Sequence, residues 1–342
     1  MSKFKVAVVG AGAVGEEMVK VLRQRDFPMS ELTILARSNR KQMIDGIEYD
    51  VKETSADAFD GIDIAFFAGT EGARGASQVF GWMAVEKGAF VVDNGDDFRM
   101  DPRVPLVVPE VNGDAIANHQ GFVANPNCST IQMVHALAPL HAIARMKRIV
   151  VSTYQSVSGT GGAAIKELQQ QAKDYAAGKK VTHDIYPAQI FANLIPQISS
   201  LRDDFDGYYG EEIKMIKETR KIFGIDDLAV SATCVRVPVF RAHSETVNVE
   251  FEKPITPDQA RKALAGWPGI EVVDDPAAGR YPMPLFAEGT DPTYVGRIRQ
   301  DSCNPNTLDM WVVADNIRKG AALNAVQIAE MAIEKQWIGN RK

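Results

Sequence analysis

The side chain in this sequence best suited to covalent chemistry is a cysteine placed where a strand gives way to a helix. Cys128 follows the apolar run at 122–124 and precedes an apolar helical pattern that begins at Ile131. The N-terminus of a helix favours thiolate over thiol, so a free thiol with a pKa near ~8.5 becomes a better nucleophile there. Backbone N–H groups at the same helix end can hold a developing oxyanion. The pattern predicts that Cys128 is a catalytic nucleophile.

The other two cysteines are interpreted differently. Cys234 lies inside the apolar run 230–235 and is expected to be an inert core residue, while Cys303 sits in a loop without a helix end. The wide spacing of the cysteines fits neither a disulfide framework nor a zinc site, so we expect no metal. It suits the reducing cytoplasm.

A thiol nucleophile needs a base within hydrogen-bond reach, and most histidines do not qualify. His135 lies about 10 Å further along the same expected helix, which is too far. His119, His141 and His183 lie in segments without other chemical features and are interpreted as surface residues.

His243 is the remaining candidate. It follows Arg236 by an odd number of positions, so one regular strand would place the two on opposite faces. Pro238 between them predicts a break or bend that removes this objection. From spacing alone, a catalytic and a non-catalytic role for His243 are equally favoured.

The N-terminal third has the pattern of a dinucleotide-binding unit. A β-branched apolar run at 5–9 leads into a glycine turn and then into a helical pattern. The glycines permit a tight turn, close approach of backbone to a pyrophosphate, and close packing of helix on strand. The helix N-terminus offers N–H groups to the phosphates. The residues expected to contact the cofactor here are Gly10, Gly12, Ala13, Val14 and Gly15.

The second expected strand, 32–36, does not end in the acidic residue that would hold a ribose 2′-hydroxyl. It ends in Arg37-Ser38-Asn39-Arg40-Lys41. Cations and a hydroxyl suit a 2′-phosphate, so NADP is favoured over NAD, with Arg37, Ser38 and Arg40 as its expected contacts. A solvated basic loop is the alternative.

Further apolar runs at βα spacing predict a parallel, doubly wound sheet. We expect an α/β Rossmann-type nucleotide domain formed by 1–127 with a returning helix at 318–342. An α+β catalytic and dimerisation domain would occupy 128–317. The expected strands are 63–68, 90–93, 106–108 and 121–124 in the first domain, and 149–153, 230–235, 246–251 and 310–313 in the second.

Composition excludes some classes of partner. The chain has 342 residues and a formal net charge of −6, so no general cationic surface is available for nucleic acid or anionic lipid. No apolar stretch reaches the length of a membrane span, and the N-terminus lacks a secretory signal. We therefore expect a cytoplasmic enzyme with small-molecule ligands.

Several ordered motifs make the chain resemble the aspartate-semialdehyde dehydrogenase family from about residue 5 to about 332. They are Asn127-Cys128-Ser129-Thr130, Ser152 to Gly159, Glu211 to Met215, Arg236 to Ser244, and Trp311 to Ala322. The resemblance implies reduction of 4-phospho-L-aspartate by NADPH to aspartate 4-semialdehyde and phosphate, and the reverse. That reaction belongs to the biosynthesis of lysine (through diaminopimelate), methionine and threonine.

The resemblance also assigns roles to residues. Cys128 would be the nucleophile, Gln155 would orient the substrate, and His243 would be the acid/base group. Arg236 would hold the substrate α-carboxylate as a bidentate fork, and Glu211 would pair with its amino group. Lys214 with Arg99 would hold phosphate, and Asn127 would contact the substrate. Ser158, Gly159 and Asn316 would contact the nicotinamide half of NADP. The family forms homodimers through the second domain.

The sequence departs from the family in two places. The glycine loop is one residue shorter than the usual GATGxVG, and the basic segment 37–41 is also short, so use of NAD beside NADP stays open. Before Arg99 the family carries Ser or Thr, whereas this chain has Gly95-Asp96-Asp97.

Other classes remain as alternatives. N-acetyl-glutamyl-phosphate reductase and malonyl-CoA reductase also form thioesters, but Glu211 and Lys214 suit a free amino group and a phosphate. Glyceraldehyde-3-phosphate dehydrogenase has its base much nearer to its cysteine. A catalytically silent NADP-binding paralogue would need none of Cys128, Gln155, Arg236 and His243.

Overall fold

The computed structural model of the protein describes residues 3–69 and 75–339. The chain forms two compact units: residues 1–127 with 321–342, and residues 128–320. The sequence pattern predicted the return to the first unit at 318, three residues before the observed return at 321. The one-turn π-helix η5 (Arg318–Ala322) spans this boundary and precedes helix α9 (Leu323–Glu334).

The first unit is built on a seven-stranded sheet in the order β3-β4-β2-β1-β5-β6-β7. All neighbouring pairs are parallel except β3 with β4. The expected α/β doubly wound sheet is thus confirmed, with an antiparallel hairpin added at one edge. The strands are β1 (Phe4–Val9), β2 (Met29–Ala36), β3 (Arg40–Ile44), β4 (Ile47–Glu53), β5 (Ile64–Phe67), β6 (Phe90–Asp93) and β7 (Phe122–Ala124).

The basic segment 37–41 is not a single loop. Arg40 and Lys41 belong to strand β3, because residues 40–44 pair with 47–51 around a turn at Asp45-Gly46, both with positive φ. One expected strand of this unit was wrong. Residues 106–108 form no strand. Only Leu106 makes an isolated bridge, to Ala124, since helix α3 (Pro109–Asn112) begins immediately afterwards.

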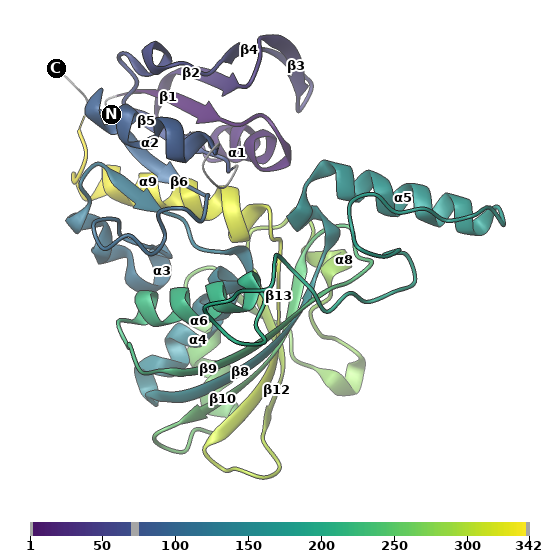
Figure 1. The fold of residues 1–342 in the computed structure, drawn as a ribbon. Helices are drawn as coiled ribbons and strands as arrows, with labels where there is room; N and C mark the ends of the chain where they lie inside the picture. The colour runs from purple at the N-terminus through teal and green to yellow at the C-terminus, as the bar shows by residue number, and fades with distance from the viewer. Residues whose placement is uncertain (1–2, 70–74, 340–342) are drawn as a thin grey trace. The chain divides into compact units, whose positions relative to one another are not determined.

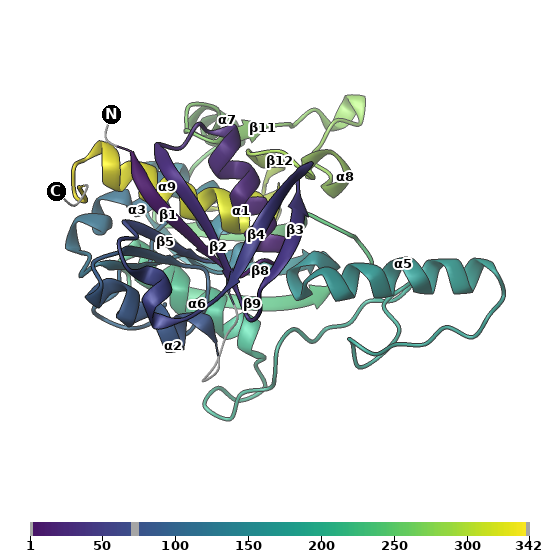
Figure 2. The same cartoon turned by 90° about the horizontal axis from the view of Figure 1, so that it is seen from above.

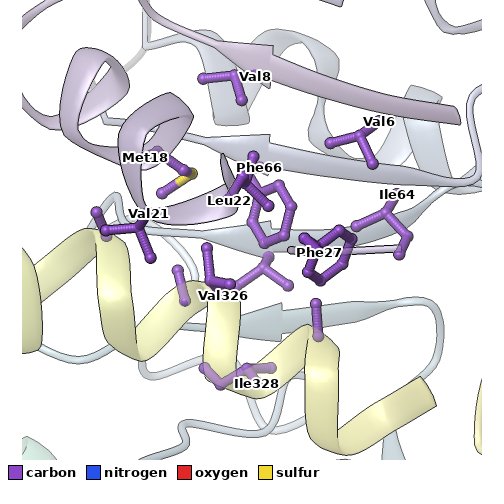
Figure 3. Packing of buried hydrophobic residues seen from close by; sticks show 14 of the residues in the cluster. Val6, Val8, Met18, Val21, Leu22, Phe27, Ile64, Phe66, Val326 and Ile328 are labelled. Carbon is purple, nitrogen blue, oxygen red and sulfur yellow. The ribbon is translucent and has the colours of Figure 1, made fainter. Parts of the chain in front are cut away.

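Helices cover both faces of this sheet (Figure 1). Helix α1 (Ala13–Gln24) and α9 share one face, where Met18 and Leu22 pack with Val326 and Ile328 over Phe66 (Figure 3). Helix α2 (Ala76–Glu86) packs on the other face, where the ring of Trp82 lies 5.1 Å from that of Phe122. Successive residues of a strand point to opposite faces of the sheet. Because helices cover both faces of a parallel sheet, the residues on both faces must be apolar. The 3₁₀ turns η1 (Ala56–Phe59) and η2 (Gly113–Asn118) complete the unit.

The second unit is built on a six-stranded mixed sheet in the order β11-β12-β13-β10-β8-β9. Pairs β8–β9 and β11–β12 are parallel and the others antiparallel. The strands are β8 (Met146–Gln155), β9 (Ala229–Arg236), β10 (His243–Phe251), β11 (Ile270–Val272), β12 (Thr293–Gln300) and β13 (Thr307–Ala314).

Helices α4 (Cys128–Ile143), α6 (Gly210–Phe223) and α7 (Pro257–Ala265) pack on one face of this sheet. The alternation along β8 shows which residues face them: Ile149, Val151, Thr153 and Gln155 are buried, while the residues between them are half-buried. A period of two with one better-covered face is typical of such a sheet.

Helix α5 (Gly162–Ala176) extends away from this sheet in both views (Figures 1 and 2). Its apolar side packs on the segment that follows it, through Ala164, Leu168 and Ile190. The remaining short elements are η3 (Val157–Thr160), η4 (Pro276–Ala278) and α8 (Pro284–Ala287). Within the described ranges, no helix is long and apolar enough to cross a membrane.

Candidate active site

The nucleophile candidate occupies the first position of a buried helix. Cys128 opens α4, and the helix behind it is almost wholly buried. Cys128 is half-buried. The N-terminus of a helix has the positive dipole end and backbone N–H groups, which favour a thiolate over a thiol.

Gly320 lies directly against this cysteine. A Cβ added to Gly320 would lie 2.9 Å from the Cβ of Cys128 and 3.6 Å from that of Asn316. Glycine at 320 therefore lets the backbone come close to both residues, which flank it.

Three candidate side chains lie together at the same end of three neighbouring strands of the second sheet. Gln155 ends β8 and Arg236 ends β9, and the two are paired in register on parallel strands. His243 begins β10, which runs antiparallel to β8, so it starts at the edge where β8 ends. All three side chains are buried, and each belongs to the alternating set that faces the helices.

Arg236 and His243 therefore do not share a strand. The segment 237–242 carries the chain over the end of β8, which lies between β9 and β10 in the sheet. The bend expected at Pro238 is present, and the parity objection does not apply.

Helix α6 supplies charged groups to the same end of these strands. Gln155 Nε2 donates to Glu211 Oε1 at 2.9 Å, and Lys214 Nζ lies 3.9 Å from Glu211 Oε2. The side-chain oxygen of Gln155 accepts from Thr153 Oγ1 at 3.1 Å, which fixes the orientation of the amide. Glu211 sits in the first turn of α6, where a negative charge is favoured by the helix dipole.

Arg236 is a buried cation with donors to spare. Its Nη1 donates to the carbonyl oxygen of Ser156 at 2.6 Å, while its Nε has no hydrogen-bond partner among residues 3–69 and 75–339. No carboxylate of the described part of the chain forms an ion pair with Arg236, and such a buried guanidinium suits an anionic ligand. A Cβ added to Gly159 would lie 3.0 Å from Nη1, so the backbone at 159 closely approaches this group.

The ring of His243 is fully buried and held through Nδ1. The backbone N–H of Ser156 donates to Nδ1 at 3.0 Å, and Ser156 Oγ lies 3.0 Å from the same atom. Burial, reinforced by the charge of Arg236, holds the pKa of His243 well below its ordinary value. The ring is therefore neutral at pH 7.

Asn316 fixes the residues next to this ring. Its Oδ1 accepts from the backbone N–H of Ala242 at 3.0 Å and lies within hydrogen-bond distance of Ser156 Oγ (3.1 Å) and Ser158 Oγ (3.0 Å). Since protein donors surround Oδ1, the amide NH₂ is the part of Asn316 that can donate to a ligand.

The glycine turn of the first unit has the geometry of a phosphate cradle. Gly10 has a φ of +106°, which only glycine adopts without strain. A Cβ on Gly15 would lie 1.8 Å from the carbonyl oxygen of Gly10, whereas one on Gly12 would meet nothing within 4 Å. Open space over Gly12, at the N-cap of α1, leaves the N–H groups of Ala13 and Val14 accessible to a ligand.

The basic residues expected at a ribose phosphate are exposed at the end of β2. Arg37, Ser38 and Arg40 all face solvent. Arg40 donates from Nη2 to Gln42 Oε1 at 2.8 Å, and Gln42 Nε2 donates to the carbonyl oxygen of Ala11 at 2.9 Å. Gln42 thereby connects the basic group to the glycine turn.

Arg99 lies in the first unit and is buried beside a carboxylate. Its Nη2 donates to the carbonyl oxygen of Asn94 at 2.7 Å. Burial raises the pKa of Asp93 to about 6, against the opposing effects of the Gly95 N–H and the Arg99 charge. Asn127, the last residue of the first segment of this unit, is also buried.

Comparisons with known proteins agree with this geometry. Residues 5–119 match the family model of the semialdehyde dehydrogenase NAD binding domain, and residues 137–319 that of the semialdehyde dehydrogenase dimerisation domain. Aspartate-semialdehyde dehydrogenases of Synechocystis and Aquifex aeolicus are 47% and 48% identical over 98% of this chain and 99% of theirs. The crystal structure of aspartate semialdehyde dehydrogenase II from Vibrio cholerae, complexed with ASA, has a TM-score of 0.92 and 42% identity over 98% of this chain and 99% of that one.

The chain belongs to the aspartate-semialdehyde dehydrogenase family. The resemblance seen in the motifs is confirmed, and so is an oxidoreductase with a nicotinamide-dinucleotide domain and a dimerisation domain.

Two residues of this family member were not found from sequence. Ser156 stood inside the motif Gln155 to Gly159, but only the fold shows its amide against His243. Gln42 carried no signal, because its role depends on the β3–β4 hairpin returning beside the glycine turn. Of the histidines interpreted as surface residues, His183 is exposed, while His119 and His141 are half-buried.

Proposed function

We propose that this chain catalyses the NADPH-dependent reduction of 4-phospho-L-aspartate to L-aspartate 4-semialdehyde and phosphate, and the reverse reaction, through a thioester on Cys128. The observation that carries the proposal is a cluster of buried side chains at the ends of β8, β9 and β10. The cluster consists of Arg236, His243 and Gln155 with Glu211 of α6. The substrate is a small zwitterion with an acyl phosphate, and these residues provide charges of the matching kinds.

In this scheme Arg236 binds the α-carboxylate with the N–H groups not used by Ser156. Glu211 pairs with the ammonium group, and Gln155, held by Glu211 and Thr153, orients the reacting carbonyl. Lys214 and Arg99 bind phosphate, and Asn127 contacts the substrate. The name of the Vibrio cholerae complex, which includes ASA, supports this class of substrate.

Cys128 attacks the acyl carbon as a thiolate, the oxyanion is held by N–H groups at the start of α4, and phosphate leaves. The bound reduced cofactor supplies the hydride that converts the acyl group to the aldehyde level. Collapse of the hemithioacetal returns the thiolate and releases the aldehyde, with His243 as the acid/base group next to the reacting oxygen.

NADP is the proposed cofactor. The glycine turn accepts a pyrophosphate, since Gly10 and Gly15 tolerate no side chain and Gly12 is open. Arg37, Ser38 and Arg40 are exposed for a 2′-phosphate. Ser158, Gly159 and Asn316 would contact the nicotinamide half. The dimerisation-domain match supports a homodimer, and the wide spacing of the three cysteines, which fits no disulfide framework, supports a cytoplasmic setting.

The test is an assay of NADP reduction with aspartate semialdehyde, with and without phosphate. We expect turnover that requires phosphate and is lost in Cys128→Ala while NADPH binding is retained. Phosphate-independent turnover, or a preference for a CoA substrate, would refute the proposal, and so would an active Cys128→Ala variant. Arg37→Ala with Arg40→Ala should raise the KM for NADPH and leave that for NADH unchanged.

A further inference from the structure

The two nitrogens of the His243 ring have different surroundings. The backbone N–H of Ser156 points at Nδ1 from 3.0 Å. A peptide N–H can only donate, so Nδ1 must carry the lone pair. Gln155 Nε2 lies 3.5 Å from the Nε2 of His243, which is longer than an ordinary hydrogen bond.

The hydroxyl of Ser156 adds a second donor to Nδ1. Ser156 Oγ lies 3.0 Å from Nδ1 and 3.1 Å from Asn316 Oδ1, so its one hydroxyl proton can serve either acceptor. Asn316 Oδ1 already accepts from the backbone N–H of Ala242 and has the hydroxyl of Ser158 within reach, both at 3.0 Å, so the proton of Ser156 is available to Nδ1. The opposite arrangement, with a proton on Nδ1, would set two N–H groups against each other.

We propose that Ser156 and Asn316 are positioning residues that hold neutral His243 in the tautomer with its proton on Nε2. The ring then enters the reaction as a hydrogen-bond donor towards the substrate oxygen, and it does not accept the thiol proton of Cys128. This inference rests on the proposed function, because it concerns the role of His243 in that reaction.

The surroundings of the ring fit a donor. A Cβ added to Gly159 would lie 3.4 Å from Nε2, so glycine at 159 keeps a second side chain, besides that of Gln155, away from that atom. The charged groups nearby are Arg236 of β9, whose charge disfavours an imidazolium, and Glu211 and Lys214 of α6, which reach the ring through Gln155. In the proposed reaction, the helix N-terminus at Cys128 is the feature that favours a thiolate.

The first test is nitrogen NMR of ¹⁵N-histidine-labelled protein without substrate, with His243→Gln to assign the signal. We expect an unprotonated Nδ1 and a protonated Nε2 at neutral pH. A protonated Nδ1, alone or in an imidazolium, would overturn the proposal. This result does not depend on turnover, so it is separate from failure of the proposed function, which the phosphate-dependent assay reports.

The second test compares Ser156→Ala, directly after β8, with Ser152→Ala, a half-buried serine on β8. Loss of one donor to Nδ1 makes protonation of the ring easier, so the acid limb of the kcat profile should move to higher pH. We expect kcat to fall about fivefold to tenfold with little change in KM. A Ser156→Ala enzyme with the pH profile and kcat of Ser152→Ala would remove Ser156 from this role.

Discussion

Arg236 Nη1 donates to the carbonyl oxygen of Ser156 at 2.6 Å, and the backbone N–H of Ser156 donates to Nδ1 of His243 at 3.0 Å. Ser156, the residue directly after β8, thus orients both the buried guanidinium and the buried imidazole. The guanidinium of Arg236 donates to the protein from Nη1, and its Nε can still donate to a ligand.

Arg236→Lys should therefore impair substrate binding more than chemistry. A lysine cannot donate to Ser156 and to a carboxylate in the same geometry. Loss of a charge-assisted hydrogen bond worth roughly 1.5–3 kcal/mol predicts a rise in KM of about tenfold to a hundredfold. Steady-state kinetics with aspartate semialdehyde measure it, and an unchanged KM would contradict the carboxylate role.

Gly320→Ala should reduce activity by moving the nucleophile. The added methyl would lie 2.9 Å from the Cβ of Cys128, and a backbone-anchored neighbour must shift to admit it. We expect kcat to drop at least tenfold and thiol alkylation by iodoacetamide to change, at a stability cost of about 1–3 kcal/mol. Gly266→Ala is the control, because its Cβ meets nothing closer than 3.7 Å. Equal kinetics in the two variants would show that this approach is unimportant.

Gly159→Ala should crowd the site from the other side. Its methyl would lie 3.0 Å from Arg236 Nη1 and 3.4 Å from the His243 ring. We expect kcat/KM to fall about tenfold or more, since both groups must move. In Gly162→Ala the methyl meets nothing within 4 Å, so that variant should retain wild-type kinetics. The prediction fails if the two variants behave alike.

Glu245 should make stability depend on pH. It is fully buried on β10, and burial holds the pKa of its carboxyl well above 4.5. Between that ordinary value and the raised one, the folded state binds more protons than the unfolded state, so stability falls as pH rises. Glu245→Gln should remove a slope of up to about 1.4 kcal/mol per pH unit.

Urea unfolding from about pH 4 to 8 measures this slope. The advantage of Glu245→Gln over the wild type should grow as pH rises through about 4.5. Glu250→Gln, a half-buried position on the same strand, is the control. Parallel curves for wild type and Glu245→Gln would show that Glu245 is ionised in the fold.

Asp93 should act similarly in the first unit, over a narrower range. Its pKa is raised to about 6 from 3.8, chiefly by burial, so the fold loses stability as pH rises from about 4 to 6. The loss amounts to roughly 3 kcal/mol. Asp93→Asn keeps an acceptor for the Gly95 N–H and should be the more stable protein at pH 7, with no advantage near pH 4. Thermal unfolding from about pH 4 to 7 measures the stability of Asp93→Asn relative to the wild type, and Asp101→Asn is the control. A stability gain of Asp93→Asn that did not vary with pH would contradict the prediction.

Local patterns were enough to predict part of this protein. The strand, glycine turn and helix of residues 4–24 appear where expected, because turn chemistry and periodicity act between neighbours in sequence. The place of Cys128 at a helix start, and Cys234 as a buried strand residue, follow from the same short-range rules.

The tertiary structure alone decided how Arg236, His243 and Gln155 meet. Their order along the chain does not reveal that β8 lies between β9 and β10, because strand order is set by packing of distant segments under α4 and α6. The same holds for Ser156, whose N–H faces His243, and for Gln42, which reaches the glycine turn from a hairpin. Sequence determined which groups were available for chemistry, and only the sheet topology determined which of them face one another.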